Sequence, residues 1–406
     1  MFAALGTLFT LACQLAAGSL LTPAQIETFK TEGVLVVPGI LSPGEIAVAR
    51  AALHRTLRRL GMDPGAWGDP TSQAALQSVQ ITGGKGGIVD MYYNEWVMKL
   101  RTHPRMFAAI SELWRATWAD ENAAPLWKAP RPLQPFNASQ GYSYIDRAVY
   151  RLPLPGSGQR GSLQPGLLPH YDQCPLDLFG ERGLLEEAPS RWRPIQSSLA
   201  LTPVAATNDS GGFLAAPRFH REFAQYYEQW DAISGHGQGA TVHCGGQFSV
   251  LRDGVRLPGE GEDAAIIKRL QPIAQAAGSA VFWDWRIPHS STATAEQAGV
   301  VTPVPREAVY AGFLPAVALN QRYAAEQLRA YRQRVLPPDF SGGREIPAQY
   351  LAPVMPKAEV GAAGDRQDSQ LQQMLDPGLA RQLLGASPWA ATPAAGDAWD
   401  RDKAEL

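Results

Sequence analysis

Pro169-His170-Tyr171-Asp172 holds two candidate metal ligands at a spacing that an extended strand would place on one face. Side chains alternate between the faces of a strand, so His170 and Asp172 are expected to project from the same side. Two histidines and one carboxylate, with the other positions open, suit a non-haem Fe(II) that binds oxygen and a substrate. Because the chain has seven histidines, a His-x-Asp spacing also arises by chance, and a third ligand must come from elsewhere. We interpret the rest of the chain as the scaffold that brings this ligand to the stretch.

The third ligand is predicted at His289, in the sequence VFWDWRIPHSS of residues 281–291. Ala280 to Trp285 has the aromatic and β-branched character of a strand, and His289 follows soon after it. Both stretches therefore lie where a strand meets a turn, which is a usual place for a ligand on a β scaffold. A fold that joins these two places would complete a metal site.

Length and composition set the broad class. The 406 residues are 45% hydrophobic and 18% charged, which is enough for a buried core in one large or two ordinary domains. The net charge of -2 and the pI of about 6.4, with no basic stripe, argue against nucleic acid as a partner. The cysteines Cys13, Cys174 and Cys244 form neither a disulfide framework nor a zinc motif. The 33 prolines and 39 glycines indicate many turns and favour a loop-rich β fold.

Residues 1–20 contain no charged side chain and are largely apolar. An apolar run so close to the start resembles the core of a signal peptide, but the basic residues that normally precede such a core are absent. Small and polar residues dilute the run, so we expect no stable membrane span. We interpret it as an apolar N-terminal leader or helix. A cytoplasmic location is favoured, and secretory or organellar targeting by residues 1–20 is the alternative.

Local signals mark helices near the start of the chain and strands in its middle. Thr22–Gln25 and Ser42–Glu45 are capping boxes with proline at the first helical position, so each predicts a helix start. Residues 62–92 look like a long loop with a strand near Ile88–Val89. Further strands are predicted at residues 142–152, 195–201, 213–216, 280–285 and 308–314. Helices followed by many short strands argue for an α+β protein built on an antiparallel β sandwich or barrel.

Arg306, which precedes the predicted strand that ends at Leu314, is a candidate carboxylate anchor. A buried arginine can hold a carboxylate through two parallel hydrogen bonds. A metal with two adjacent open positions and an arginine nearby would suit a 2-oxo acid that carries a distal carboxylate. The alternative for Arg306 is a strand-edge residue in a surface ion pair.

Several stretches, in the same order, resemble the phytanoyl-CoA dioxygenase-like family of Fe(II)- and 2-oxoglutarate-dependent oxygenases. They are LTPAQI (21–26), GVLVVPG (33–39), LSPGE (41–45), HYD (170–172), residues 208–220, GSAVFWDWRIPH (278–289) and LLGASPW (383–389). Each motif is modest, but their order and number make the match specific. The resemblance spans about residues 21–390.

The resemblance implies a double-stranded β-helix, or jelly roll, with a core at about residues 140–316 flanked by helices. It implies that Fe(II) has three protein ligands, which are His170, Asp172 and His289. It also implies 2-oxoglutarate as co-substrate, bound through Arg306 and contacted by Ser291, with O2 in the last open position.

Two positions depart from the family's pattern. Arg306 lies farther from His289 than the family's arginine usually does, so Arg286 is kept as the alternative anchor. The family's Pro-Gly-Ser-His element reads Pro217-Arg218-Phe219-His220 here, and we interpret His220 as structural.

We therefore predict one oxygenase domain over residues 21–390, followed by a disordered tail at 391–406. The predicted function is hydroxylation of a small-molecule substrate that depends on Fe(II) and 2-oxoglutarate. The alternative is a jelly-roll protein that binds a metal or a ligand without turnover. Tyr171, Trp285 and Cys174 are candidate pocket residues, although a plain buried thiol is the simpler role for Cys174 and core packing is the simpler role for Trp283.

Overall fold

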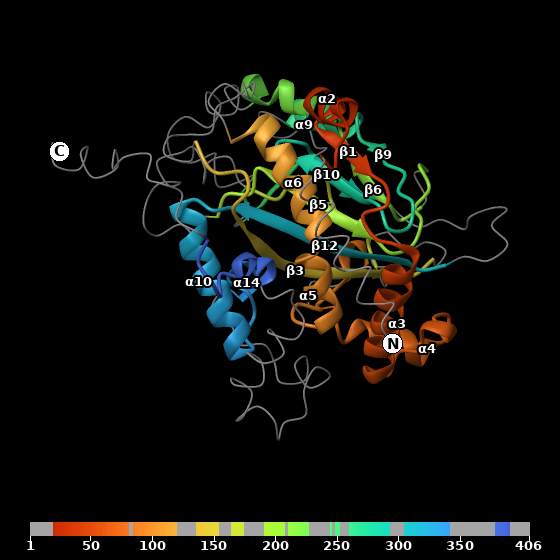
Figure 1. Ribbon diagram of the computed structural model, residues 1–406. Coiled ribbons are helices and arrows are strands. Elements are labelled where there is room, and N and C mark those ends of the chain that lie inside the picture. The colour runs from red at the N-terminus through yellow and green to blue at the C-terminus, as the bar shows by residue number, and fades with distance from the viewer. Residues whose placement is uncertain are drawn as a thin grey trace.

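The computed structural model places two β sheets at the centre of the molecule and helices around them (Figure 1). It describes residues 19–80, 84–119, 135–153, 164–173, 191–207, 210–226, 244–245, 248–251, 260–292, 304–341 and 378–389. Residues 1–18 of the predicted leader, the predicted tail at 391–406 and Cys174 lie outside these ranges.

The first sheet has six strands, and each strand runs antiparallel to its neighbours. Their order across the sheet is β1 (Val34–Val37), β10 (Ala280–Asp284), β5 (Ile195–Ala200), β12 (Arg306–Pro315), β3 (Gly141–Arg151) and β2 (Ile88–Val89). β3 is buried along nearly its whole length, so both faces of the sheet are covered there.

The second sheet also has six strands, which are shorter and again antiparallel. Their order is β7 (Cys244–Gly245), β8 (Phe248–Val250), β4 (His170–Tyr171), β11 (His289–Ser291), β6 (Phe213–Ala215) and β9 (Gln271–Pro272). The two sequence stretches that carry the predicted ligands therefore form adjacent strands, β4 and β11.

Successive strands alternate between the two sheets through most of the core. Along the chain, β3, β5, β10 and β12 belong to the first sheet, whereas β4, β6 and β11 belong to the second. Phe213 on β6 and Trp283 on β10 pack together with ring centroids 4.7 Å apart, so side chains of the two sheets meet in the core. The combination of helices with antiparallel sheets agrees with the predicted α+β class.

Several helices begin at a capping residue followed by proline. The helices are α2 (Pro23–Glu32), α3 (Pro43–Arg59), α4 (Pro70–Gln77), α5 (Glu95–Arg101), α6 (Pro104–Thr117), α9 (Glu260–Ile267), α10 (Ala318–Gln333), α11 (Pro338–Ser341) and α14 (Leu379–Leu383), with the short 3-10 helices η1 (Pro64–Ala66), η2 (Lys85–Gly87) and η3 (Phe219–Arg221). Both predicted capping boxes, at Thr22 and Ser42, are formed. The prediction of a long loop over residues 62–92 was wrong at α4, which Asp69 caps by accepting a hydrogen bond from the amide of Ser72.

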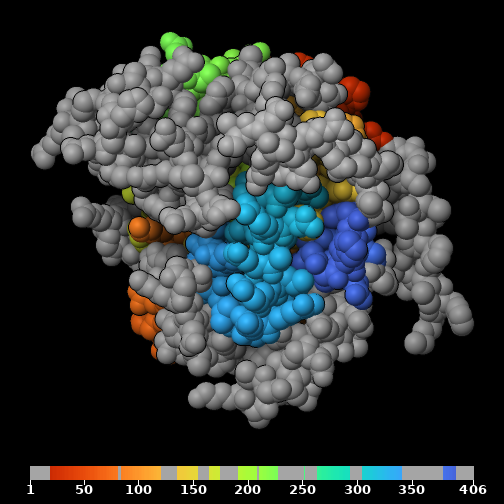
Figure 2. Space-filling view, turned by 90° about the vertical axis from the view of Figure 1, so that its left-hand side faces the viewer, coloured from red at the N-terminus to blue at the C-terminus, as the bar shows by residue number. Residues whose placement is uncertain are grey.

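Helices α5, α6, α10 and α14 pack against β3 or β12 of the first sheet (Figure 1). In Figure 2, α10 and α14 lie side by side on one face of the molecule. No helix in the described part of the chain combines the length and the apolar character that a membrane crossing needs.

Candidate metal centre

The pairing of β4 with β11 places two histidines directly opposite each other. His170 and His289 are Cα partners in this pairing, and their ring centroids lie 4.3 Å apart. Asp172 follows β4 directly. One ligand atom from each of the three residues lies within 4.8 Å of the other two, which is close enough for all three to contact one metal ion.

The two imidazole rings are oriented in the same way. Nδ1 of His170 lies 2.6 Å from the carbonyl oxygen of Leu168, and Nδ1 of His289 lies 3.1 Å from that of Ile287. Since a carbonyl oxygen can only accept, both Nδ1 atoms carry the hydrogen and donate it. This leaves each Nε2 lone pair available, and backbone carbonyls commonly orient metal-binding histidines in this way.

Both Nε2 atoms face the carboxylate of Asp172. The distances are 3.2 Å from Nε2 of His170 to Oδ1 and 3.6 Å from Nε2 of His289 to Oδ2. Two lone pairs and a carboxylate repel one another unless a cation lies among them. The donor set therefore fits a divalent metal with two nitrogen ligands and one oxygen ligand.

The environment favours the charge states that metal binding needs. Burial alone would raise the pKa of Asp172, but the imidazole rings of His170 and His289 beside the carboxylate hold this pKa well below its usual range. Burial and the neighbouring His170 lower the pKa of His289. The carboxylate is therefore ionised and the His289 ring is neutral at neutral pH, as metal ligands must be.

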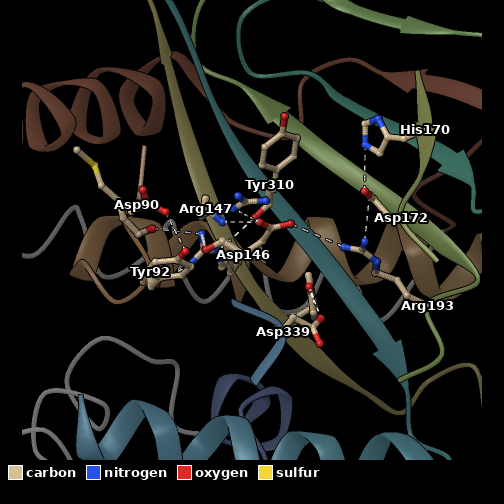
Figure 3. A network of polar contacts seen from close by, with 12 residues as sticks. Asp90, Tyr92, Asp146, Arg147, His170, Asp172, Arg193, Tyr310 and Asp339 are labelled. Atoms are coloured by element: carbon tan, nitrogen blue, oxygen red, sulfur yellow. Dashed lines mark hydrogen bonds and ion pairs between the residues drawn. The ribbon is translucent and has the colours of Figure 1, made fainter. Parts of the chain in front are cut away.

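Arg193 holds the Asp172 carboxylate from the side opposite His170 (Figure 3). Its Nη2 lies 3.1 Å from Oδ2 of Asp172, and its Nη1 lies 3.9 Å from Oδ2 of Asp146. The Arg193 side chain is only 5% exposed and stacks over the ring of Tyr144. The sequence prediction missed Arg193, which lies two residues before the buried strand predicted at 195–201.

Gln173 anchors the chain on both sides of this contact. Its side chain accepts a hydrogen bond from the amide of Arg193 at 3.0 Å and donates one to the carbonyl of Arg193 at 2.9 Å. The residue after Asp172 is thereby tied to the segment that supplies the arginine. The orientation of Asp172 is thus fixed by backbone as well as by side-chain contacts.

A cavity of about 70 Å³ extends from the three predicted ligands between the two sheets. Both predicted co-substrate residues, Arg306 and Ser291, line it. Arg306 is buried, and its Nε has no hydrogen-bond partner among the described residues. A surface groove of about 620 Å³ lies between α3 and α5 and shares no lining residue with this cavity. The larger of these two hollows is therefore not the one beside the predicted ligands.

Arg286, the alternative anchor, is committed elsewhere. Its Nε and Nη2 donate to the two carboxylate oxygens of Asp284 at 2.7 and 2.8 Å, and its guanidinium stacks over the ring of Trp118. Arg286 does not line the cavity. Of the two candidates, Arg306 is the arginine that faces the predicted ligands.

The aromatic wall of the cavity differs from the expected one. Tyr171 and Trp285 do not line it: Tyr171 packs against Phe223 and two other aromatic rings, and Trp285 also packs against Phe223. The aromatic residues that line it are Phe213, Trp283 and Tyr310, and the ring centroids of Phe213 and Trp283 lie 5.7 and 5.2 Å from that of His289. Strand alternation explains Tyr171, because the residue between His170 and Asp172 must point to the opposite face.

The fold is shared with solved structures at low sequence identity. A hypothetical protein of Escherichia coli, JW0805, is 17% identical with a TM-score of 0.58, over 87% of this chain and 83% of that chain. GlcNAc Inducible Gene 2 (GIG2, DUF1479) of Candida albicans is 13% identical with a TM-score of 0.58, over 93% and 79% of the two chains. A protein named provisionally as an oxidoreductase, from Salmonella typhimurium LT2, is 15% identical with a TM-score of 0.56, over 84% of each chain.

No protein-family model matches the sequence, and no curated protein matches it either. At these identities the structural matches show a common fold and nothing about the reaction. The function must therefore be argued from the side chains of the site.

Proposed function

We propose that this protein is an Fe(II)- and 2-oxoglutarate-dependent dioxygenase that hydroxylates a small-molecule substrate. The observation that carries the proposal is the convergence of His170, Asp172 and His289, with both Nε2 atoms aimed at the carboxylate. Two imidazoles and one carboxylate with open positions suit non-haem Fe(II). The provisional oxidoreductase name of one fold relative agrees with this reaction class.

The strand order supports the finer proposal of a double-stranded β-helix of the phytanoyl-CoA dioxygenase-like kind. From β3 to β6 and again from β10 to β12, each strand lies in the other sheet from the strand before it. A chain that crosses between two antiparallel sheets in this way winds as a helix of strands, which is the pattern of a jelly roll. The proposed core, at about residues 140–316, would run from β3 to β12.

Three residues of the site would bind the metal, and two others would bind the co-substrate. His170, Asp172 and His289 would hold the iron, which together with 2-oxoglutarate and O2 supplies the oxidising power for hydroxylation. Arg306 would pair with the distal carboxylate of 2-oxoglutarate, and Ser291 would donate to the same group.

The surrounding side chains would control access and geometry. Phe213 and Trp283 place aromatic surface beside His289, which limits the water that reaches the metal. Arg193 keeps Asp172 in a single orientation through its contact with Oδ2. Oδ1 of that carboxylate then remains on the side of His170.

The proposal is tested by iron content and by succinate release that depends on 2-oxoglutarate, with and without candidate substrates. We expect about one bound iron per chain in the wild type and none in His170→Ala. Succinate release, including slow release without substrate, is expected only from the wild type. Iron binding without any succinate release would instead support the jelly-roll binding protein, and full iron affinity in His170→Ala would refute the ligand set.

A further inference from the structure

Arg151 lies directly opposite Arg306 where β3 pairs with β12. The Arg151 side chain is 0% exposed, and that of Arg306 is 7% exposed. Nε of both residues and Nη2 of Arg151 have no hydrogen-bond partner within the part of the chain that the structure describes. Residues opposite each other in a sheet project to the same side, so two buried guanidinium groups lie together beside the cavity.

Another arginine of the same chain shows that the fold can satisfy a buried guanidinium. Arg101 is also 0% exposed. Its N–H groups donate to the backbone carbonyls of Met91, Tyr92, Asp146 and Tyr310. Among the described residues, the Arg151 guanidinium donates only to Oγ of Ser291, so burial of an arginine in this fold does not by itself explain the unpaired N–H groups.

Two adjacent buried cations are unfavourable in the absence of an anion. Burial and the nearby Arg306 lower the pKa of Arg151 to about 10, and burial lowers the pKa of Arg306. At neutral pH both groups remain protonated and repel each other. A carboxylate beside Arg306 would relieve the repulsion and give the unpaired Nε of Arg306 an acceptor.

The Arg151 contact also decides what the Ser291 hydroxyl can do. Oγ of Ser291 accepts a hydrogen bond from Nη1 of Arg151 at 3.1 Å and another from the amide of Leu167 at 3.1 Å. A hydroxyl oxygen has two acceptor sites and one hydrogen, so both acceptor sites are occupied. The hydrogen is left to donate, and Ser291 lines the same cavity as Arg306.

Two glycines allow the chain to close over this arrangement. A Cβ atom on Gly87 would lie 2.5 Å from Cβ of Arg151, and one on Gly86 would lie 3.2 Å from Oγ of Ser291. Both glycines have positive φ angles, of 66° and 75° for Gly86 and Gly87. The loop that contains η2 therefore approaches Arg151 and Ser291 as closely as only glycine permits, which keeps water away from both.

We propose that Arg151 is a positioning residue that acts through Ser291 to make the Arg306 end of the cavity select 2-oxo acids with a distal carboxylate. The inference rests on the proposed function in that it takes 2-oxoglutarate as the co-substrate. Arg151 supplies a second positive charge and turns the Ser291 hydroxyl into an obligate donor. Arg306 makes the direct contact with the carboxylate.

The test measures binding without turnover. 2-Oxoglutarate and 2-oxopentanoate, which has a methyl group in place of the distal carboxylate, are titrated calorimetrically onto Mn(II)-loaded protein without O2. Glutarate is titrated onto metal-free protein, so that the carboxylate site is also measured independently of the metal. The variants are Arg151→Met, Arg151→Lys, Ser291→Ala and the Arg151→Met/Ser291→Ala double variant. Arg59→Met removes one charge from an exposed helix position as the matched control.

We expect Arg151→Met to weaken binding of 2-oxoglutarate and glutarate about tenfold or more while leaving 2-oxopentanoate nearly unchanged. The variant removes a positive charge and releases the Ser291 hydroxyl, and both changes act only at the distal end. Arg151→Lys should retain most of the affinity. The double variant should lose little more than Arg151→Met alone, because Ser291 acts only while Arg151 fixes its hydroxyl. Arg59→Met should bind like the wild type.

If the wild type binds glutarate but releases no succinate, the proposed function is contradicted, while the role of Arg151 in carboxylate binding is still supported. Wild-type affinity in Arg151→Met would overturn the inference, as would fully additive losses in the double variant or no glutarate binding by the wild type. If Arg151→Met does not fold, Ser291→Ala and Arg151→Lys decide: equal loss of 2-oxoglutarate and 2-oxopentanoate in Ser291→Ala would contradict a role at the distal end.

Discussion

The Asp172 carboxylate contacts two histidines and one arginine, and these contacts fix its orientation. Its Oδ1 faces His170, while its Oδ2 is shared between His289 and Arg193. A carboxylate held from two sides cannot rotate freely, so the metal would meet a ligand that is already oriented.

Arg193→Gln is expected to lower metal affinity about tenfold, because loss of the Nη2 contact frees Asp172 to rotate. Anaerobic titration with Mn(II) measures the effect. Arg193→Lys should lose less than Arg193→Gln. Unchanged or tighter Mn(II) binding in Arg193→Gln would show that the charge of the arginine opposes the metal more than its contact helps.

The candidate site residues that the sequence predicted lie in short motifs, and the two that it missed do not. His170, Asp172, His289, Arg306 and Ser291 stand in recognisable short motifs, and the structure brings all five around one cavity. Their roles as iron and co-substrate ligands stay predictions. Arg151 ends β3 and Arg193 lies two residues before β5, and it is the tertiary fold that brings both of them to the site.

Trp283 and Trp285 show where alternation along a strand fails to predict which side chains face the site. Trp283 and Trp285 are two residues apart, so a continuous strand would place both on the same face. Trp283 lines the cavity, but Trp285 does not. β10 ends at Asp284, so Trp285 lies in a turn where side chains no longer alternate. The exact strand end is the least certain feature of a sequence-based prediction, and here it decided which ring faces the site.

At the scale of elements, the C-terminus of α2 is fitted against η3. Gly33 ends α2 with a φ of 69°, and a Cβ atom there would lie 2.5 Å from Nδ1 of His220. His220 donates from Nε2 to the carbonyl of Lys30 at 3.0 Å, which gives it the structural role expected for it.

Gly33→Ala is therefore expected to lower the free energy of unfolding by about 1–3 kcal/mol, through backbone strain and the clash with His220. Urea denaturation measures the change. Gly44→Ala is the matched control, because a Cβ at Gly44 has no neighbour within 4 Å and the residue lies in α3. Equal stability of the two variants would contradict the close packing of α2 on η3.

The buried ion pair between Asp284 and Arg286 forms the turn that leads from β10 to β11. Both side chains are 3% exposed. Burial alone would raise the pKa of Asp284, but Arg286 holds this pKa below its usual range. The pair therefore contributes stability above the ordinary aspartate pKa of about 4, and this stability is lost as the pH falls through the lower folded-state pKa.

Asp284→Asn is expected to lower the free energy of unfolding by about 3–5 kcal/mol at pH 7, because it leaves the Arg286 charge buried and unpaired. Below about pH 4 the wild type progressively loses the same interaction, so the difference between the two proteins should shrink. Urea denaturation at pH 7 and near pH 3 tests this. A difference that does not change with pH would mean that packing, and not charge, holds the turn.

Element prediction succeeded where the signal was local. The capping boxes of α2 and α3 lie within four residues of sequence, and both formed. α4 was missed because glycine and hydroxyl residues around it outweighed the Asp69-Pro70 start signal in our interpretation. β4 is only two residues long and depends on its neighbours in the sheet, so no local pattern could establish its pairing.

At the scale of the whole molecule, the site exists only when distant segments meet. β4 and β11 are separated by more than a hundred residues of sequence, and their register places His170 against His289. Composition and patterning predicted the α+β class, but strand order and register depend on packing across the whole core. A one-residue shift of β11 would turn His289 to the other face.

A metal ion that joins these segments should stabilise the whole fold. At a free Mn(II) concentration of 100 times Kd, linkage predicts about 2.7 kcal/mol of added stability, seen as a rise in Tm by calorimetry. Chelation should reverse the rise, and His170→Ala should abolish it. Mg²⁺ is the control, because it prefers oxygen ligands and should give little effect. A rise that persists in His170→Ala would place the stabilising metal elsewhere.

The three residues of β11 carry His289 at one end and Ser291, the proposed co-substrate contact, at the other. A strand advances about 3.3 Å per residue, so His289 and Ser291 are about 6.6 Å apart along the strand. β11 thereby sets a molecular length. A 2-oxo acid held by the metal at one end and by Ser291 and Arg306 at the other must span a fixed interval. One added or removed methylene group would leave one of its two ends out of register, and rigid backbone geometry, more than chemical affinity, would then exclude it.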